Sequence, residues 1–151
     1  EDNGSGAVGS GVSIRPTGTG GAHVTMTRVQ VFNNPVGISI DGDNSTGPIN
    51  VAILNSQVSG NTGNGFNSLS PNNSDSLVRV TIDSSAFLTN GTIGVQSVGQ
   101  RSTVRIGRST VTVNGNAGLQ ANNQGILQSY GENFTEGNGA ANVGATPANP
   151  S

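Results

Sequence analysis

Short runs in which hydrophobic and polar residues alternate return along the chain every 24 to 29 residues. Each unit opens with a glycine and an alternating run such as GVSI or GISI, and the opening glycines are Gly11, Gly37, Gly65, Gly94 and Gly118. A period of two is typical of a β-strand with one buried face, and no run follows the 3.6-residue period of a helix. The pattern therefore predicts an all-β chain built from five similar units.

A second alternating run follows in every unit. These runs begin at Val24, Val51, Val80, Val104 and Leu127. Seven positions later comes one more apolar residue, which predicts a short third strand; these residues are Val31, Val58, Phe87, Val111 and Phe134. Each unit is thus expected to contain two strands and a shorter third one.

Units of this length are too short to form separate sheets, but they fit the coils of a solenoid. Equivalent strands of neighbouring coils lie about 4.8 Å apart, so five coils make a column roughly 24 Å tall. We expect an all-β, right-handed parallel β-helix (solenoid) of about five coils, with three short strands per coil. It covers residues 11–138, with 1–10 as a flexible or edge-pairing segment and 139–151 as a tail that could cap the last coil.

One asparagine closes each unit. The five residues are Asn34, Asn61, Asn90, Asn114 and Asn138. A tight turn between strands requires a residue that tolerates positive φ and can bond its own backbone, and asparagine does both. Repeated once per coil, the amides can also bond one another along the stack, so the sequence predicts a structural asparagine ladder.

Composition narrows the possible partners. The chain has no cysteine, so it has neither disulfides nor a thiolate metal site. Six arginines, no lysine and a net charge of −2 provide no basic field for nucleic acid. No apolar run approaches the roughly 18 residues of a membrane span. We therefore expect neither a nucleic acid partner nor a membrane span.

Coils of the form GVxI followed by VTIxxSxVxxN, closing on ILQSYGENFTEGN, resemble the bacterial right-handed parallel β-helix repeat proteins of the pectate-lyase-like superfamily. This superfamily includes pectate lyases, polygalacturonases, alginate epimerases, phage tailspikes and adhesins, so the resemblance implies the fold and leaves the function open. Its members usually have more coils and an N-terminal cap. The chain therefore looks like the carboxyl-terminal portion of a longer solenoid or a reduced version of one.

The densest polar group predicted on any face lies on the second strands. Asp83 is expected one coil from Gly107 and close to Arg105, Arg108 and Tyr130, which makes these the catalytic candidates. Outward Thr81, Arg105 and Gln128 continue the strip along the stack and could bind polysaccharide hydroxyls or carboxylates. The alternative is a solvated sheet face with an Asp83–Arg108 pair that contributes less than about 1 kcal/mol.

Two weaker candidates come from the acidic loops and the single histidine. Asp41, Asp43 and Asp75 are expected at one edge, where they could hold Ca²⁺ or, alternatively, act as solvated turn residues. Apart from this possible Ca²⁺, no cofactor is predicted. His23 is expected in one column with Asn50, Arg79 and Thr103, as a catalytic residue or as a polar surface residue.

Repetition assigns two further groups to the structure of the solenoid. Arg15 and Asp41 occupy matching positions one coil apart, which predicts a cross-coil ion pair. Ser56, Ser85 and Ser109 share an inward column near a corner, where a packing role is favoured because a nucleophile is needed only once.

The residues leave three hypotheses for function. The first is a non-catalytic extracellular or envelope module that binds glycans or supports assembly. The second is a small polysaccharide lyase or hydrolase that uses a polar cluster on the solenoid face. The third is a purely structural solenoid, for which an ice-binding surface fits poorly because the outward column is mixed. Open strand edges at the solenoid ends also predict a homo-oligomer formed through the ends or the sheet faces.

Overall fold

The structure is a computed structural model that describes residues 9–71 and 75–148 of the 151-residue chain. These residues form strands and turns and no helix, so none of them belongs to a helix that could cross a membrane. Residues 1–8, which make up most of the predicted N-terminal segment, lie outside the described residues. The fold is all-β, as the alternating pattern predicts.

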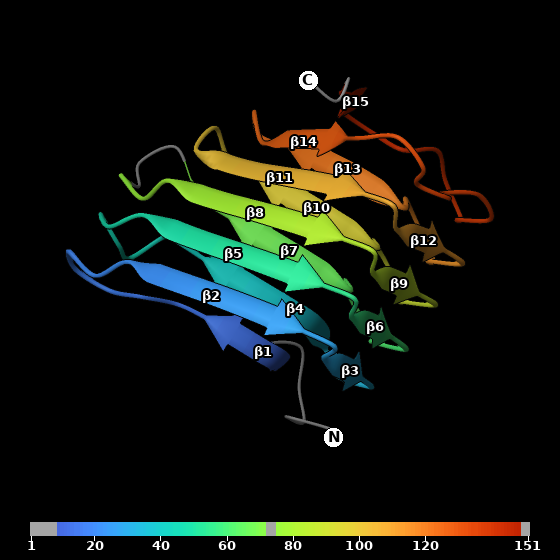
Figure 1. Ribbon diagram of the computed structural model, residues 1–151, viewed down its shortest axis with the longest axis horizontal. Coiled ribbons are helices and arrows are strands. Elements are labelled where there is room, and N and C mark those ends of the chain that lie inside the picture. Colours follow the sequence, from blue (N-terminus) through green and yellow to red (C-terminus); the bar gives the residue numbers. More distant parts are fainter. Residues whose placement is uncertain (1–8, 72–74, 149–151) are drawn as a thin grey trace.

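The strands form three parallel sheets that run along the solenoid, with equivalent strands stacked side by side (Figure 1). The first sheet contains β1 (Ser10–Ile14), β4 (Val36–Asp41), β7 (Phe66–Leu69), β10 (Val95–Val98) and β13 (Leu119–Asn122). The second contains β2 (Ala22–Thr27), β5 (Ile49–Leu54), β8 (Val78–Asp83), β11 (Ser102–Gly107), β14 (Ile126–Ser129) and β15 (Ala145–Pro147). The third contains β3 (Gln30–Phe32), β6 (Gln57–Ser59), β9 (Ala86–Leu88) and β12 (Thr110–Thr112).

Four coils contribute a strand to all three sheets, and a fifth contributes β13 and β14. Each strand pairs in parallel with its equivalent in the next coil; in the second sheet Val24 pairs with Val51, Val51 with Val80 and Val80 with Val104. The parallel β-helix predicted from the spacing of the repeats is therefore confirmed, with three strands in each complete coil.

Inward side chains form a continuous aliphatic core between the sheets. In the second sheet the buried hydrophobic members are Met26, Ile49, Val51, Ile53, Val78, Val80, Ile82, Val104, Ile106 and Leu127. Phe66 of the first sheet and Phe87 of the third meet inside the core, with ring centroids 6.4 Å apart and planes at 75°. Such an edge-to-face contact adds to the stabilisation from burial.

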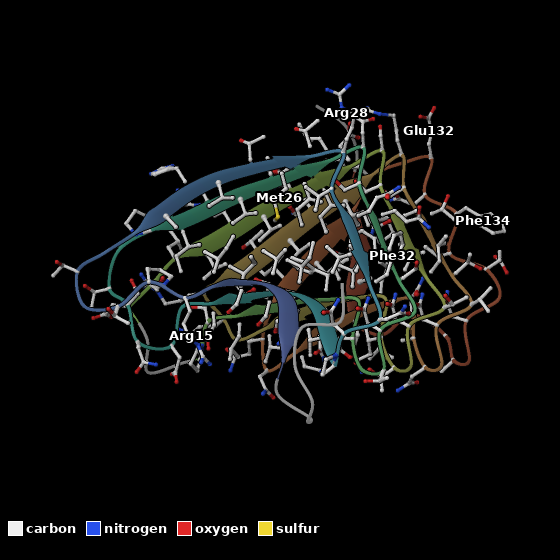
Figure 2. The ribbon with its side chains drawn as sticks, turned by 90° about the horizontal axis from the view of Figure 1, so that it is seen from below. Arg15, Met26, Arg28, Phe32, Glu132 and Phe134 are labelled. Atoms are coloured by element: carbon white, nitrogen blue, oxygen red, sulfur yellow. The ribbon has the colours of Figure 1, made fainter. Side chains whose placement is uncertain are left out.

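The last coil departs from the predicted register. Phe134 was expected to be the equivalent of Val111, but this is wrong: Phe134 aligns with Thr110 and is 55% exposed. Figure 2 shows its ring outside the ribbon, whereas Met26 points into the interior. The corner before Asn133 contains one more residue than the equivalent corner of the preceding coil, since Ser129 pairs with Ile106 but Asn133 lies against Ser109. Phe134 therefore takes the outward position of Thr110.

The asparagine ladder is present in all coils. Asn61 Nδ2 donates to Asn90 Oδ1 at 2.8 Å, Asn90 Nδ2 to Asn114 Oδ1 at 2.9 Å, and Asn114 Nδ2 to Asn138 Oδ1 at 2.9 Å. The backbone N–H of each donor residue binds the same oxygen. The predicted bonding of amides along the stack is therefore confirmed.

The expected conformation of the ladder asparagines is wrong. None of them has positive φ; the residue directly before each one does, and these residues are Asn33, Gly60, Thr89, Val113 and Gly137. The preceding residue makes the sharp turn of the chain, so the ladder asparagine itself needs no positive φ. Its amide points into the core, where it bonds the next asparagine. Val113 adopts this conformation at φ 57° despite its branched side chain.

The opening glycines are required by close packing. A Cβ on Gly94 would lie 2.3 Å from Val111 Cγ1, 2.7 Å from the Gly118 carbonyl oxygen and 2.8 Å from Asn114 Nδ2. Real Cβ atoms do not approach heavy atoms this closely, so the ladder and the next coil occupy the space that any larger residue needs.

The segment after Asn138 folds against the last coil. Ala140 bridges to Ala117 and Val143 to Gln120, and β15 pairs with β14. At the opposite end, β1, β2 and β3 are the outermost strands of their sheets and have a neighbour on one side among the described residues. Within residues 9–71 and 75–148, the last coil is thus covered by a following segment and the first coil is not.

Candidate binding grooves on the solenoid surface

The outer face of the second sheet presents two columns of side chains. One contains His23, Asn50, Arg79, Thr103 and Ile126, and the other Thr25, Ala52, Thr81, Arg105 and Gln128. This pairing confirms the predicted alignment of both columns. Because neighbouring strands lie about 4.8 Å apart, the face offers polar groups at a regular spacing along the solenoid axis.

A shallow groove of about 420 Å³ runs over β2, β5 and β8 between these columns. The side chains that line it are His23, Thr25, Asn50, Ala52, Arg79 and Thr81 with Val24 and Val51 below them. Small Ala52 leaves a hollow between Thr25 and Thr81. His23 therefore lies in a polar groove, next to amide, guanidinium and hydroxyl groups rather than beside an acid.

Arg105 and Gln128 extend the second column beyond the groove. Arg105 pairs with Thr81 on one side and Gln128 on the other. The Oε1 atom of Gln128 is buried and has no hydrogen-bond partner. Buried polar atoms usually have a partner, so this oxygen is an acceptor whose bonding capacity is unused.

The predicted cluster around Asp83 forms in part. Arg108 Nη2 lies 2.5 Å from Asp83 Oδ2. Gly107 lies between Asp83 and Tyr130, since a Cβ placed on it would be 4.0 Å from Asp83 Oδ1 and 3.5 Å from Tyr130 Cβ. Asp83, Arg108 and Tyr130 thus lie together around Gly107, while Arg105 points outward two residues earlier on the same strand.

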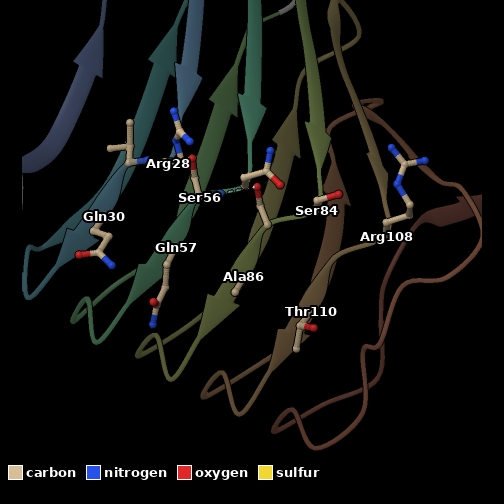
Figure 3. A pocket seen from close by; sticks show the side chains of 11 residues that line it. Arg28, Gln30, Ser56, Gln57, Ser84, Ala86, Arg108 and Thr110 are labelled. Atoms are coloured by element: carbon tan, nitrogen blue, oxygen red, sulfur yellow. Dashed lines mark hydrogen bonds between the residues drawn. The ribbon is translucent and has the colours of Figure 1, made fainter.

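A second groove, of about 510 Å³, follows the corner between the second and third sheets (Figure 3). One side carries Arg28, Asn55, Ser84 and Arg108, and the other carries Gln30, Gln57, Ala86 and Thr110. The floor includes the buried Ser56 and Ser85. The groove therefore spans four coils and has a guanidinium near each end.

A serine ladder shapes this corner. The backbone N–H groups of Val29, Ser56 and Ser85 each donate to the next serine hydroxyl in the stack, at 3.1 Å. Ser109 N–H donates to Asn133 Oδ1 at 2.9 Å, so Asn133 ends the ladder. The predicted packing role of Ser56, Ser85 and Ser109 is confirmed, because their hydroxyls are buried and bonded within the solenoid.

The acidic loops do not converge on a metal site in the described ranges. Arg15 Nε and Nη2 donate to Asp41 Oδ2 at 2.8 and 2.6 Å, which confirms the predicted cross-coil pair. Asp43 N–H donates to Asp41 Oδ1 at 2.9 Å. Asp75 completes no group of three possible ligands with them among residues 9–71 and 75–148. Asp41 therefore functions as an ion-pair partner and a turn acceptor.

Charge is unevenly distributed over the surface. Four of the six arginines lie on the second sheet or at the corner that follows it: Arg28, Arg79, Arg105 and Arg108. Asp83 is the acidic residue within this group, and Glu132 follows at the same corner in the last coil. A chain with a net charge of −2 thus has a locally positive side.

The corner residues Arg28, Asn55 and Ser84 were missed by the sequence reading. The signal was present, because each directly precedes a member of the inward corner column, at Val29, Ser56 or Ser85, as Arg108 precedes Ser109. Neighbours of a buried column necessarily lie at the corner surface, where they share a groove.

Comparison of the chain with protein-family models, with curated proteins and with solved structures found no match. The functional argument therefore rests on the two grooves and their side chains.

Proposed function

We propose that this chain is an extracellular or cell-envelope module that binds glycans on the outer face of its second sheet. The groove lined by His23, Asn50, Arg79 and Thr81 is the observation that supports the proposal. Its donors and acceptors repeat along one axis on a rigid sheet, which suits a linear polymer with hydroxyl groups at regular intervals.

The groove is open and polar, so binding would depend on hydrogen bonds rather than on enclosure. A hydrogen bond to a charged group contributes about 1.5 to 3 kcal/mol. Arg79 and Arg105 provide such groups on adjacent columns, and the exposed hydroxyls of Thr25 and Thr81 can act as both donor and acceptor. Several weak contacts along the axis would then give a modest affinity.

Calorimetric titration with neutral and acidic oligosaccharides tests the proposal. The expected result is saturable binding, with affinity lowered about tenfold by Arg79→Gln, which corresponds to roughly 1.4 kcal/mol. Asn116→Ala, on an exposed residue of another corner, serves as the control and should bind like the parent chain. Absence of binding to the whole panel, or equal affinity in the Arg79 variant, would contradict the proposal.

A catalytic alternative, a small polysaccharide lyase or hydrolase, is favoured by the grouping of Asp83, Arg108 and Tyr130. An arginine next to a carboxylate and a phenol could position a sugar acid and transfer a proton. Turnover of a glycan in the titration panel, abolished by Asp83→Asn, would establish this alternative. Turnover that EDTA removes would instead point to the Ca²⁺ dependence expected for Asp41, Asp43 and Asp75.

Self-association is also part of the proposal. In the described residues the outer edges of β1, β2 and β3 have unpaired backbone groups, and such edges pair readily with another chain. Light scattering at micromolar concentration should give at least twice the monomer mass. A monomer mass across that range would contradict an oligomer formed through the solenoid ends or the sheet faces.

A further inference from the structure

At the corner between the second and third sheets, four successive coils each have one non-glycine residue with positive φ. Arg28, Asn55, Ser84 and Arg108 have φ values of 56°, 50°, 49° and 48°. Glycine adopts this conformation without strain, asparagine tolerates it, and arginine and serine do so at a cost. The equivalent position of the next corner also has positive φ throughout, at Asn33, Gly60, Thr89, Val113 and Gly137. Positive φ is therefore part of the coil geometry at both corners, and at this one it leaves the four side chains exposed.

The charges in this groove lie at its ends. Arg28 is exposed on the first coil and Arg108 on the fourth, three strand spacings apart, or roughly 14 Å along the axis. Between them the corner carries the neutral Asn55 and Ser84. The Ser84 hydroxyl donates to Asp83 Oδ2 at 3.2 Å, and the same oxygen pairs with Arg108 Nη2, which leaves the other N–H groups of Arg108 for a ligand. Glu132 continues the same column after Arg108 and places a negative charge beyond that end.

The opposite wall provides uncharged hydrogen-bonding groups. Gln30, Gln57 and Thr110 belong to the outward column of the third sheet, and Ala86 interrupts it (Figure 3). Carboxamides and hydroxyls both donate and accept, as sugar hydroxyls do. Ala86 widens the groove next to Ser84, at its middle.

The position of the charges and the lack of aromatic residues in the groove indicate which kind of linear anion it could bind. A nucleic acid strand has a phosphate at every nucleotide and relies on aromatic stacking, but the residues that line this groove include no aromatic side chain and no cation at the middle. A fully charged polymer would likewise place anionic groups beside neutral Asn55 and Ser84. The lining instead matches a ligand with acidic groups at two separated points and hydroxyls between them.

We propose that the corner groove lined by Arg28, Asn55, Ser84 and Arg108 is a second binding site, which takes a linear oligosaccharide whose acidic sugars alternate with uncharged ones. Arg28 binds one acidic group and Arg108 another, while Asn55, Ser84 and Gln57 bind the sugar between them. The site lies on a different surface from the second-sheet groove, so each can fail without the other.

The test measures binding of an oligosaccharide of alternating glucuronate and N-acetylglucosamine to the full chain, by calorimetry at two salt concentrations. A polyuronate of equal length, a neutral dextran oligosaccharide and a glutamate peptide are compared with it. The alternating oligosaccharide should bind most tightly. Arg28→Gln and Arg108→Gln should each weaken it about tenfold, the loss expected for one charge-assisted hydrogen bond.

Two further variants show whether a loss of affinity arises from the groove itself. The first tests for an effect on stability, and the second tests for an effect of net charge alone. Arg28→Gly relieves the positive φ, so its melting temperature should equal or exceed that of the parent while its affinity falls as in Arg28→Gln. Arg101→Gln removes one positive charge before the other end of β11 and should leave the affinity unchanged. Equal losses in Arg101→Gln and Arg28→Gln, or tighter binding of the polyuronate or the peptide, would overturn the proposal.

Discussion

Asn114 Oδ1 accepts two hydrogen bonds from Asn90, one from the side-chain Nδ2 at 2.9 Å and one from the backbone N–H at 3.1 Å. Asn90 Oδ1 accepts the equivalent pair from Asn61. Each ladder asparagine therefore connects its own coil to both neighbours. A solenoid in which coils contact only adjacent coils depends strongly on such connections.

Asn90→Ala should lower the free energy of unfolding by about 2 to 4 kcal/mol, because it leaves the buried donors of Asn61 without a partner and removes one of the two hydrogen bonds to Asn114 Oδ1. Asn90→Asp should also destabilise, since it loses the Nδ2 donor and places oxygen against oxygen. The measurement is urea denaturation. Asn116→Ala is the control and should stay within about 0.5 kcal/mol of the parent; a comparable loss there would contradict a special role for the ladder.

Gly94→Ala should destabilise the solenoid strongly, because the added methyl group has no space between Val111, Asn114 and the Gly118 carbonyl. Overpacking of this kind costs about 1 to 3 kcal/mol, and more where the contact is with backbone. Gly131→Ala is a matched control, since a Cβ there meets no atom within 4 Å. Thermal unfolding should show a large drop in melting temperature for the first variant and almost none for the second.

The two ion pairs should differ in strength. The side chain of Asp41 is 6% exposed and that of Asp83 is 27% exposed, whereas the arginine partners are both largely in solvent. Arg15→Gln removes the positive charge that pairs with the buried Asp41 carboxylate, so it should lower the free energy of unfolding by about 1 to 3 kcal/mol. Arg108→Gln should cost less than about 1 kcal/mol. Equal losses in urea denaturation would show that burial does not distinguish the pairs.

The corrected register of the last coil predicts opposite results at two phenylalanines. Phe87→Ala removes a fully buried ring that contacts Phe66 and should cost about 3 to 5 kcal/mol. Phe134→Ala removes an exposed ring and should change stability by less than about 0.5 kcal/mol. Equal damage from Phe134→Ala and Phe87→Ala would instead favour the alignment of Phe134 with Val111 that the sequence predicts.

The fold could be predicted because each coil repeats the same spacing, so that Val24, Val51 and Val80 fall into register without knowledge of the turns. The exception at Phe134 comes from the additional residue before Asn133. Asn133 takes the place of a serine in the serine ladder and accepts the same hydrogen bond with its longer side chain. That substitution preserves the hydrogen bond. The sequence marks the shift only in one spacing, because Asn138 follows Leu127 by eleven residues, whereas the other ladder asparagines follow the start of their second run by ten.

The candidate site on the strands was predicted. At the corner, the sequence places Arg28, Asn55 and Ser84 next to the inward column but does not predict their conformation. The column containing Thr81, Arg105 and Gln128 follows directly from alternation. The corner groove depends on positive φ at Arg28 and Ser84, residue types that give no sequence signal for that conformation. The positions of these side chains depend on the turns. The alternation of hydrophobic and polar residues predicts side-chain direction only within strands, so it does not predict the corner groove.

Three ladder asparagines, Asn90, Asn114 and Asn138, directly precede a glycine. In a flexible chain the glycine nitrogen attacks the asparagine carboxamide, ammonia leaves, and the resulting succinimide opens with water to aspartate or isoaspartate, which makes asparagine a thermolabile residue. In the solenoid the Gly91 N–H donates to the Asn61 carbonyl at 2.7 Å and the Gly115 N–H to the Asn90 carbonyl at 2.8 Å. The glycine nitrogens and the ladder carboxamides are thus engaged in separate hydrogen bonds, which opposes their reaction in the folded chain. Deamidation of these asparagines is therefore expected mainly in unfolded chains, and the number of amides lost would increase with the time that a chain spends unfolded.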